Sequence, residues 1–308
     1  MPTDLSVPSH LCGMSLARSP LNPQGGAALS IGVMAAILLG ALLHAIWNAL
    51  IRAGADKTLN TLLIVVGAGL VTACYLPSVP APAEASWPYL AVSVLIHVVY
   101  FSFIALSYRN AELSFVYPIM RGTAPVISAV AVVFVLNESP SPVGWLGVMI
   151  ACSSIVLLTA ESWRKGVLRP APSALAFANA GVIVIYTVVD GIGARLSGNP
   201  FSYTGWMILF TAAPVTIACF LKRPQFMAIS IRANFILVLA GGACTFGSYG
   251  LALWAMTHAP IALVAALRET SVVFGTIIAA TLLHENVSPI RYLAILGVIA
   301  GAIAIKVS

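Results

Sequence analysis

The chain is a succession of long apolar blocks separated by short polar connections. The blocks are continuous rather than alternating, and each approaches the roughly 20 apolar residues that a helix needs to cross a bilayer. Strands of a membrane barrel would instead alternate apolar and polar side chains. The pattern therefore predicts ten membrane-spanning helices, at residues 29–51, 60–79, 88–108, 112–136, 141–160, 173–194, 202–221, 235–256, 260–283 and 288–306.

The connections between these blocks carry helix breakers and most of the charge. Pro80 and Pro82 separate the second and third blocks, and Asn199-Pro200 separates the sixth and seventh. Of the 308 residues, 60% are hydrophobic and 8% are charged, whereas a soluble domain has about 25% charged residues. So few charges cannot cover a water-exposed surface, so an all-α integral membrane protein in a lipid bilayer is predicted. The net charge of +6 is scattered without a basic stripe, which argues against nucleic acid as a partner.

The two halves of the chain share landmarks in the same register. The shift that carries Arg121 onto Arg268 also carries Glu138 onto Glu285. Such matches in register favour a duplication over chance similarity of composition. The sequence therefore predicts two five-helix repeats at 29–161 and 173–308, joined by a basic linker at 162–172 and preceded by a disordered tail at 1–28.

A repeat of five helices crosses the membrane an odd number of times, so the second repeat enters from the face opposite to the first. The halves are therefore expected to be inverted around a central cavity, an arrangement by which many transporters alternate access to one site. Lysine and arginine are concentrated in the connections that follow odd-numbered helices. By the positive-inside rule that face is cytoplasmic, which places both termini outside.

Arginines within two predicted spans are the first candidates for chemistry. A charged side chain at a helix centre costs roughly 2.5–3.5 kcal/mol on insertion scales, so each needs a function or a partner. Arg121 shares a helix face with Tyr117 near the predicted midplane, and Arg268 is its counterpart in the second repeat. A buried guanidinium can bind the carboxylate or phosphate of a small-molecule solute. The alternative is an ion pair with Asp190 or Glu269 that locks the halves together.

Two acids, Asp190 and Glu269, lie well inside predicted spans. Asp190 shares a polar helix face with Tyr186 and is a candidate for proton coupling, since a carboxyl group in a low-dielectric site can exchange protons near neutral pH. It is equally suited to be a fixed partner of Arg121 or Arg268. Glu269 is the second proton-coupling candidate. It points about 100° away from Arg268 around a helix, so the two need not share a partner.

Histidine and aromatic side chains are further candidates for solute binding. His44, Trp47 and Asn48 share a face near the end of the first predicted helix, where imidazole, indole and amide groups suit a polar or aromatic solute. The alternatives are an interfacial role for Trp47 and simple packing for His44. His97 and Tyr100, one turn apart in the third predicted helix, are also assigned to the solute site, as are Tyr117 and Tyr186.

The sequence lacks the signatures of several other functions. It has no nucleophile elbow, zinc-protease motif, phosphate-binding loop or paired carboxylates on one helix, so neither an enzyme nor an ATP-driven pump is expected. The five cysteines are dispersed, and no metal or other cofactor is expected. A membrane-embedded enzyme or a non-transporting accessory protein is the alternative function. Gly297 and Gly301 predict close packing within the bundle, which favours a monomer and leaves a homodimer open.

The layout and several segments resemble the EamA-type transporters of the drug/metabolite transporter superfamily. The resemblance spans residues 29–307 and includes His44-Ala45-Ile46-Trp47-Asn48, Tyr117-Pro118-Ile119-Met120-Arg121-Gly122, Ala266-Leu267-Arg268-Glu269-Thr270-Ser271, Glu138 and Glu285. It implies a basket-like bundle with a cavity lined by the first, third, fourth, sixth, eighth and ninth helices. It also implies a multi-pass inner-membrane secondary transporter, commonly an exporter of amino acids or related metabolites and often proton-coupled. Members usually keep both termini in the cytoplasm, so the family and the charge bias disagree on orientation. The two arginines favour a solute with a carboxylate or phosphate.

Overall fold

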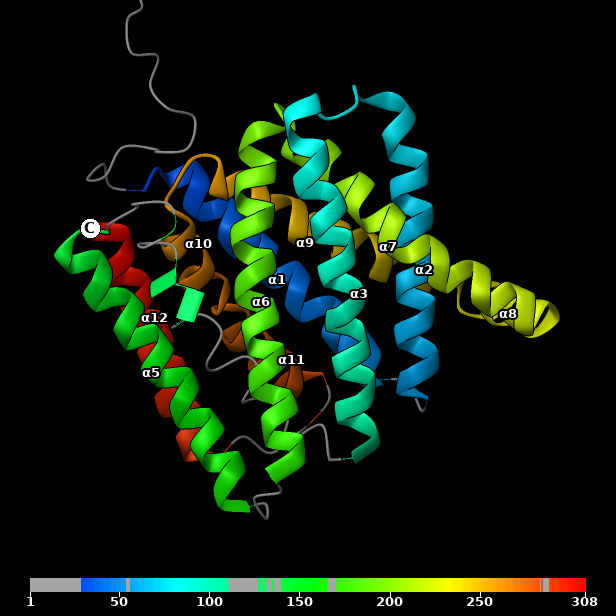
Figure 1. Cartoon of the computed structure of the whole chain (residues 1–308). Coiled ribbons are helices and arrows are strands. Elements are labelled where there is room, and N and C mark those ends of the chain that lie inside the picture. Colours follow the sequence, from blue (N-terminus) through cyan, green and yellow to red (C-terminus); the bar gives the residue numbers. More distant parts are fainter. Residues whose placement is uncertain are drawn as a thin grey trace, which may run out of the picture.

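In the computed structural model the apolar blocks form helices that pack side by side and cross one another (Figure 1). The structure describes residues 29–53, 56–110, 127–128, 130–131, 135, 140–165, 170–282, 284 and 288–308. Several predictions lie outside the described residues: the disordered tail at 1–28, most of the fourth helix at 112–136, Tyr117, Arg121, Glu138 and Glu285.

The described elements are all helical. They are α1 (Ile31–Ala53), α2 (Lys57–Tyr75), the 3-10 turns η2 (Leu76–Ser78) and η3 (Glu84–Ser86), α3 (Trp87–Asn110), α5 (Pro142–Lys165), α6 (Pro170–Leu196), α7 (Pro200–Lys222), α8 (Pro224–Ala233), α9 (Phe235–Met256), α10 (Ile261–Arg268), α11 (Ser271–Thr281) and α12 (Pro289–Val307). Seven helical stretches within the described part are long and apolar enough to cross a membrane, and α5 contributes a shorter one. The chain is therefore a helical, multi-pass membrane protein.

Helix starts are fixed locally by capping side chains and prolines. The carboxylate of Asp56 accepts a hydrogen bond from the backbone N–H of Leu59 (2.9 Å) at the start of α2. The side-chain oxygen of Asn199 accepts from two backbone N–H groups at the start of α7, including that of Ser202 (3.1 Å). Pro200 follows Asn199 at the first helical position, where its missing N–H is not needed. The breakers in the sequence therefore set where each span begins.

One helix was not predicted: α8 lies in the connection between the seventh and eighth predicted spans. Pro224 suits a first helical position, and Met227 and Ser230 are buried while Phe226 and Ile229 are exposed. Ten residues are too few to span a bilayer, so the sequence showed only a connection. Figure 1 shows α8 extending outward beyond the rest of the bundle.

The predicted ninth span, 260–283, is interrupted rather than continuous. It divides into α10 and α11 at Glu269 and Thr270. There the backbone N–H of Thr270 bonds to the carbonyl of Leu267 (3.0 Å), and that of Val272 bonds to Glu269 (3.0 Å), three residues apart instead of four. Such a tightened turn inside a span often marks a hinge or a functional position.

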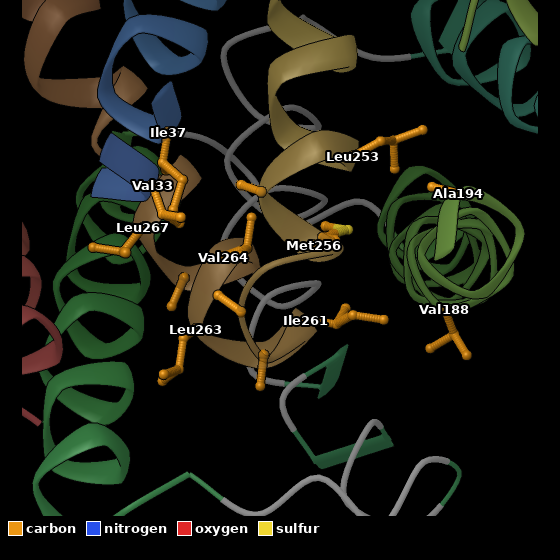
Figure 2. Packing of buried hydrophobic residues seen from close by; sticks show 14 of the residues in the cluster. Val33, Ile37, Val188, Ala194, Leu253, Met256, Ile261, Leu263, Val264 and Leu267 are labelled. Atoms are coloured by element: carbon orange, nitrogen blue, oxygen red, sulfur yellow. The ribbon is translucent and has the colours of Figure 1, made fainter. Parts of the chain in front are cut away.

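The hydrophobic core is centred on α10, of which six of eight residues are buried. Figure 2 shows Leu267 beside Val33 and Ile37 of α1, while Ile261 points toward α6, near Val188. A helix that is apolar on all sides belongs in the centre of a bundle. Its last residue, Arg268, is consequently brought into the middle of the protein.

Helices from the two halves pack against each other in pairs: α1 with α9, α2 with α7, α2 with α9, α3 with α6, and α5 with α12. Glycines allow the closest of these approaches. A Cβ atom added at Gly147 of α5 would lie 2.8 Å from the carbonyl oxygen of Gly301, and one added at Gly301 would lie 2.7 Å from that of Gly147. The small-residue motif of α12 thus packs within the chain, as the sequence predicted. Gly67 of α2 approaches α9 in the same way, since a Cβ there would overlap the carbonyl oxygen of Val238.

Two hydrogen bonds of the connection before α3, one with the connection before α7 and one with the first turn of α7, also join the halves at one end of the bundle. The backbone N–H of Ala83, between η2 and α3, donates to the carbonyl of Ser197, between α6 and α7 (3.0 Å). The hydroxyl of Ser202 donates to the carbonyl of Pro80 (2.7 Å). We call this pair of contacts the inter-half seam. It holds the start of α7 against the start of α3.

Candidate functional site

Asp190 of α6 is fully buried, and both of its carboxylate oxygens accept hydrogen bonds from tyrosine hydroxyls. Tyr203 of α7 donates to Oδ1 (3.1 Å), and Tyr249 of α9 donates to Oδ2. A buried carboxylate is costly unless it is hydrogen-bonded, and these two hydroxyls supply that stabilisation. Gly193 makes the approach of Tyr203 possible, because a Cβ there would lie 2.5 Å from its hydroxyl oxygen.

A group of rings surrounds this carboxylate. The ring of His97 lies 4.8 Å from that of Tyr186 and 6.1 Å from that of Tyr249, measured between centroids. Tyr186 lies 5.7 Å from Tyr100 and 6.4 Å from Tyr249. The rings meet edge-on or tilted, which is the arrangement that aromatic quadrupoles favour. The rings belong to α3, α6 and α9 and lie beside Asp190.

His97 is oriented by its own helix. Its Nδ1 lies 2.9 Å from the carbonyl oxygen of Ser93, one turn earlier on α3. A carbonyl oxygen only accepts hydrogen bonds, so Nδ1 carries the hydrogen and Nε2 is the acceptor nitrogen of the neutral ring. The hydroxyl of the buried Ser93 lies 3.3 Å from the same Nδ1, so this turn of α3 holds the imidazole through two oxygen atoms.

Arg268 lies over the ring of Tyr249, with Cζ 5.4 Å from the ring centroid. This is a cation–π contact at a partly buried position. Tyr249 therefore contacts a carboxylate through its hydroxyl and a guanidinium through its ring face. We call the whole group the Asp190 cluster, comprising Ser93, His97, Tyr100, Tyr186, Asp190, Tyr203, Tyr249 and Arg268.

Five residues that the sequence predicted for the site come together in this cluster: His97, Tyr100, Tyr186, Asp190 and Arg268. The contacts described for three others lie within α1. The rings of His44 and Trp47 meet edge-on at 4.9 Å, and the amide of Asn48 donates to the carbonyl of His44 (2.8 Å). Tyr117 and Arg121 lie outside the described residues.

Glu269 follows Arg268 at the end of α10, the helix that packs against α5, and it is 4% exposed. Arg268 contacts Tyr249 of α9. Of the two predicted proton-coupling acids, Asp190 is the one in the cluster.

Sequence reasoning missed Ser93, Tyr203 and Tyr249. Tyr249 lies between Ser248 and Gly250 in the middle of an apolar block, which is a signal of close helix packing around a polar side chain. Tyr203 follows a helix start by a few residues and therefore resembled an interfacial aromatic residue. Neither position revealed a carboxylate partner from another helix.

The cluster offers a carboxyl group, a guanidinium, an imidazole and four phenol rings in one place. These groups can bind both charged and aromatic parts of a small solute, and the carboxyl group can exchange a proton. Within the described part of the chain, no group of three or more His, Cys, Asp or Glu side chains is placed to hold a metal ion.

Comparisons with known proteins agree with this architecture. No curated protein matches the chain, whereas 28 chains of solved structures do. One of these, a crystal structure titled only as that of a protein, has a TM-score of 0.66 at 19% identity, covering 89% of this chain and 96% of that one, and so shares the fold. The model of the EamA-like transporter family matches residues 172–307. This stretch, a little under half of the chain, is therefore similar to the EamA-like transporter family, within the drug/metabolite transporter superfamily.

Proposed function

We propose that the chain is a secondary transporter that moves a small polar solute, an amino acid or an organic anion, across the inner membrane by alternating access, and that this movement is coupled to protons. The Asp190 cluster carries this proposal, because it places a carboxyl group and a guanidinium inside a bundle of apolar spans. Ionisable groups at that depth cost folding free energy, and transporters retain them for binding and proton transfer. The match of residues 172–307 to the EamA-like transporter family is consistent with this assignment.

The position of the cluster supports binding between the two halves. Ser93, His97 and Tyr100 come from α3 in the first half, whereas the other members come from the second half. Secondary transporters hold their solute at the junction between repeats, where a movement of one half exposes it to either face. A solute that contacts residues of both halves would respond to such a movement.

The helix pairs support an inverted duplication at 29–161 and 173–308. If the helices of the two halves are matched by their order along the chain, α1 corresponds to α6 and α3 corresponds to α9. The packed pair α1–α9 then corresponds to the packed pair α6–α3. The α2–α7 and α5–α12 pairs map onto themselves. A two-fold axis within the membrane plane accounts for these equivalences and for the odd number of helices per repeat.

Replacing Arg268 or its counterpart Arg121 with alanine is expected to reduce transport of an anionic solute at least about tenfold. A charge-assisted hydrogen bond contributes about 1.5–3 kcal/mol, and 1.4 kcal/mol corresponds to a tenfold change in affinity. Purified protein in liposomes, offered labelled amino acids and organic acids with and without a pH gradient, measures the effect.

Arg291→Ala is the matched control, because this exposed arginine lies at the start of α12. It should transport like the wild-type protein. Unchanged transport by both Arg268→Ala and Arg121→Ala would contradict a role of the arginines in solute binding. Absence of transport for every solute in the wild-type protein would contradict the proposed function itself.

A further inference from the structure

Tyr249 contacts two groups of opposite charge on two different helices, and it uses a different part of its side chain for each. Its hydroxyl donates to the carboxylate of Asp190 on α6, and its ring lies under the guanidinium of Arg268 on α10. The hydroxyl bond fixes the direction of the ring about α9, and the ring in turn fixes the guanidinium. The acid and the arginine are thus linked through one side chain.

Tyr203 provides an internal comparison. Its hydroxyl donates to the other oxygen of the same carboxylate, and it is as deeply buried as Asp190. Its ring packs against Gly193 on α6. Both tyrosines donate a hydrogen bond to Asp190, whereas the contact with a guanidinium is described for Tyr249 and not for Tyr203.

Arg268 lies at a point where its helix can adjust. It is the last residue of α10, directly before the tightened turn at Glu269 and Thr270 that separates α10 from α11. Backbone hydrogen bonds in such turns have poorer geometry than those of a regular helix, so they break at a lower cost. A change in what holds Arg268 is therefore transmitted to the junction of α10 and α11.

Other titratable or charged groups surround Asp190. On the elements packed against α6 they are His97 and Tyr100 of α3, Tyr203 of α7, Tyr249 of α9, Arg268 of α10 and the exposed Glu84 of η3. On α6 itself they are Tyr186 and Arg195, and Arg195 donates to the carbonyls of Met256 and Ala259. Asp190 is the acid that accepts hydrogen bonds from Tyr203 and Tyr249. A change in its charge therefore acts directly on the hydroxyl of Tyr249.

We infer that Tyr249 is a positioning residue that couples the charge on Asp190 to the position of Arg268. This inference rests on the proposed function and names how its proton site and its solute site communicate. An ionised Asp190 accepts a strong, charge-assisted hydrogen bond and holds the ring of Tyr249 under Arg268. A protonated Asp190 accepts a weaker bond, so the ring and the guanidinium are released and Arg268 becomes available to an anionic solute. Proton uptake then favours solute binding.

Amide hydrogen exchange of residues 261–281 tests this coupling without any solute. The protein is reconstituted in nanodiscs at mildly acidic and mildly alkaline pH, and the rates are corrected for the effect of pH on chemical exchange. In the wild-type protein we expect about fivefold faster exchange near Glu269 at acidic pH, as a difference of one charge-assisted bond implies. Tyr249→Phe keeps the ring but loses the hydroxyl, so the fast exchange should occur at both pH values.

Tyr203→Phe is the matched variant, since it removes a hydroxyl from the same carboxylate and leaves the ring under Arg268 in place. It should retain the pH difference. Three results would overturn the inference. The exchange rates of the wild-type protein could be independent of pH, Tyr249→Phe could keep the wild-type difference between the two pH values, or Tyr249→Phe and Tyr203→Phe could lose that difference equally. Asp190→Asn tests the link from its other end if Tyr249→Phe does not fold, and it should also show exchange that does not depend on pH.

Transport assays separate this inference from the proposed function. A wild-type protein that moves no solute but retains pH-dependent exchange at the α10–α11 junction would contradict transport and leave the coupling intact. A protein that transports solute with the same pH profile in Tyr249→Phe as in the wild type would contradict the coupling and leave transport intact.

Discussion

Asp190→Asn is expected to reduce transport driven by a pH gradient to the level of protein-free liposomes. The amide has nearly the shape of the carboxylate and can still hydrogen-bond Tyr203 and Tyr249, so the helices around it should keep their places. It has no proton to release or take up, however, and so cannot couple solute movement to a gradient. Exchange of labelled for unlabelled solute across the membrane needs no net proton transfer and should persist. Flux measurements in liposomes under both conditions distinguish the two.

Asp56→Asn is the control for this substitution. Asp56 caps α2 by accepting a hydrogen bond from Leu59, and asparagine caps helices about as well as aspartate. This variant should transport normally with an unchanged dependence on pH. Wild-type flux and pH dependence in Asp190→Asn would rule out Asp190 as the proton site and leave Glu269 as the next candidate.

Gly67→Ala is expected to have the largest effect on stability. A Cβ atom at this position overlaps the backbone carbonyl of Val238, and a backbone atom cannot turn aside as a flexible side chain can. The helices α2 and α9 would have to separate, and overpacking of this kind typically costs about 1–3 kcal/mol. The expected result is a lower midpoint of thermal unfolding, followed by tryptophan fluorescence in detergent, and a lower yield of monodisperse protein.

Gly275→Ala makes the same chemical change on α11, where an added Cβ meets nothing within 4 Å. Alanine is favoured over glycine in a helix by roughly 0.5–1 kcal/mol, so this variant should unfold at the wild-type temperature or slightly above it. Equal unfolding temperatures for the two variants would show that α2 and α9 do not need the close approach at Gly67.

Much of the helical layout could be predicted because the physics of a span is local. The predicted helix at 235–256 coincides with α9 (Phe235–Met256), and the prediction at 202–221 falls inside α7 (Pro200–Lys222). Apolar length and prolines determine these bounds. The split of α10 from α11 could not be predicted, because neither a proline nor a glycine marks Glu269 and Thr270 and their tight turn depends on packing neighbours.

The candidate site was predictable only where a polar side chain stood out against an apolar background. Asp190, Arg268 and His97 are conspicuous in this way. Tyrosine is common both in cores and at membrane interfaces, so neither Tyr203 nor Tyr249 indicated that its hydroxyl binds a carboxylate on another helix. Both tyrosines reach Asp190 only because α6, α7 and α9 pack together, and the pattern of residues along the chain does not contain that packing.

The inter-half seam has a genetic consequence. The bond from Ala83 to Ser197 joins two backbone groups, so any side chain except proline at position 83 preserves it. Only the bond from Ser202 to Pro80 depends on a side chain. Random mutagenesis followed by selection for loss of transport should therefore recover few substitutions at this end of the molecule and many in the Asp190 cluster. The halves can diverge in sequence along the seam while remaining attached there.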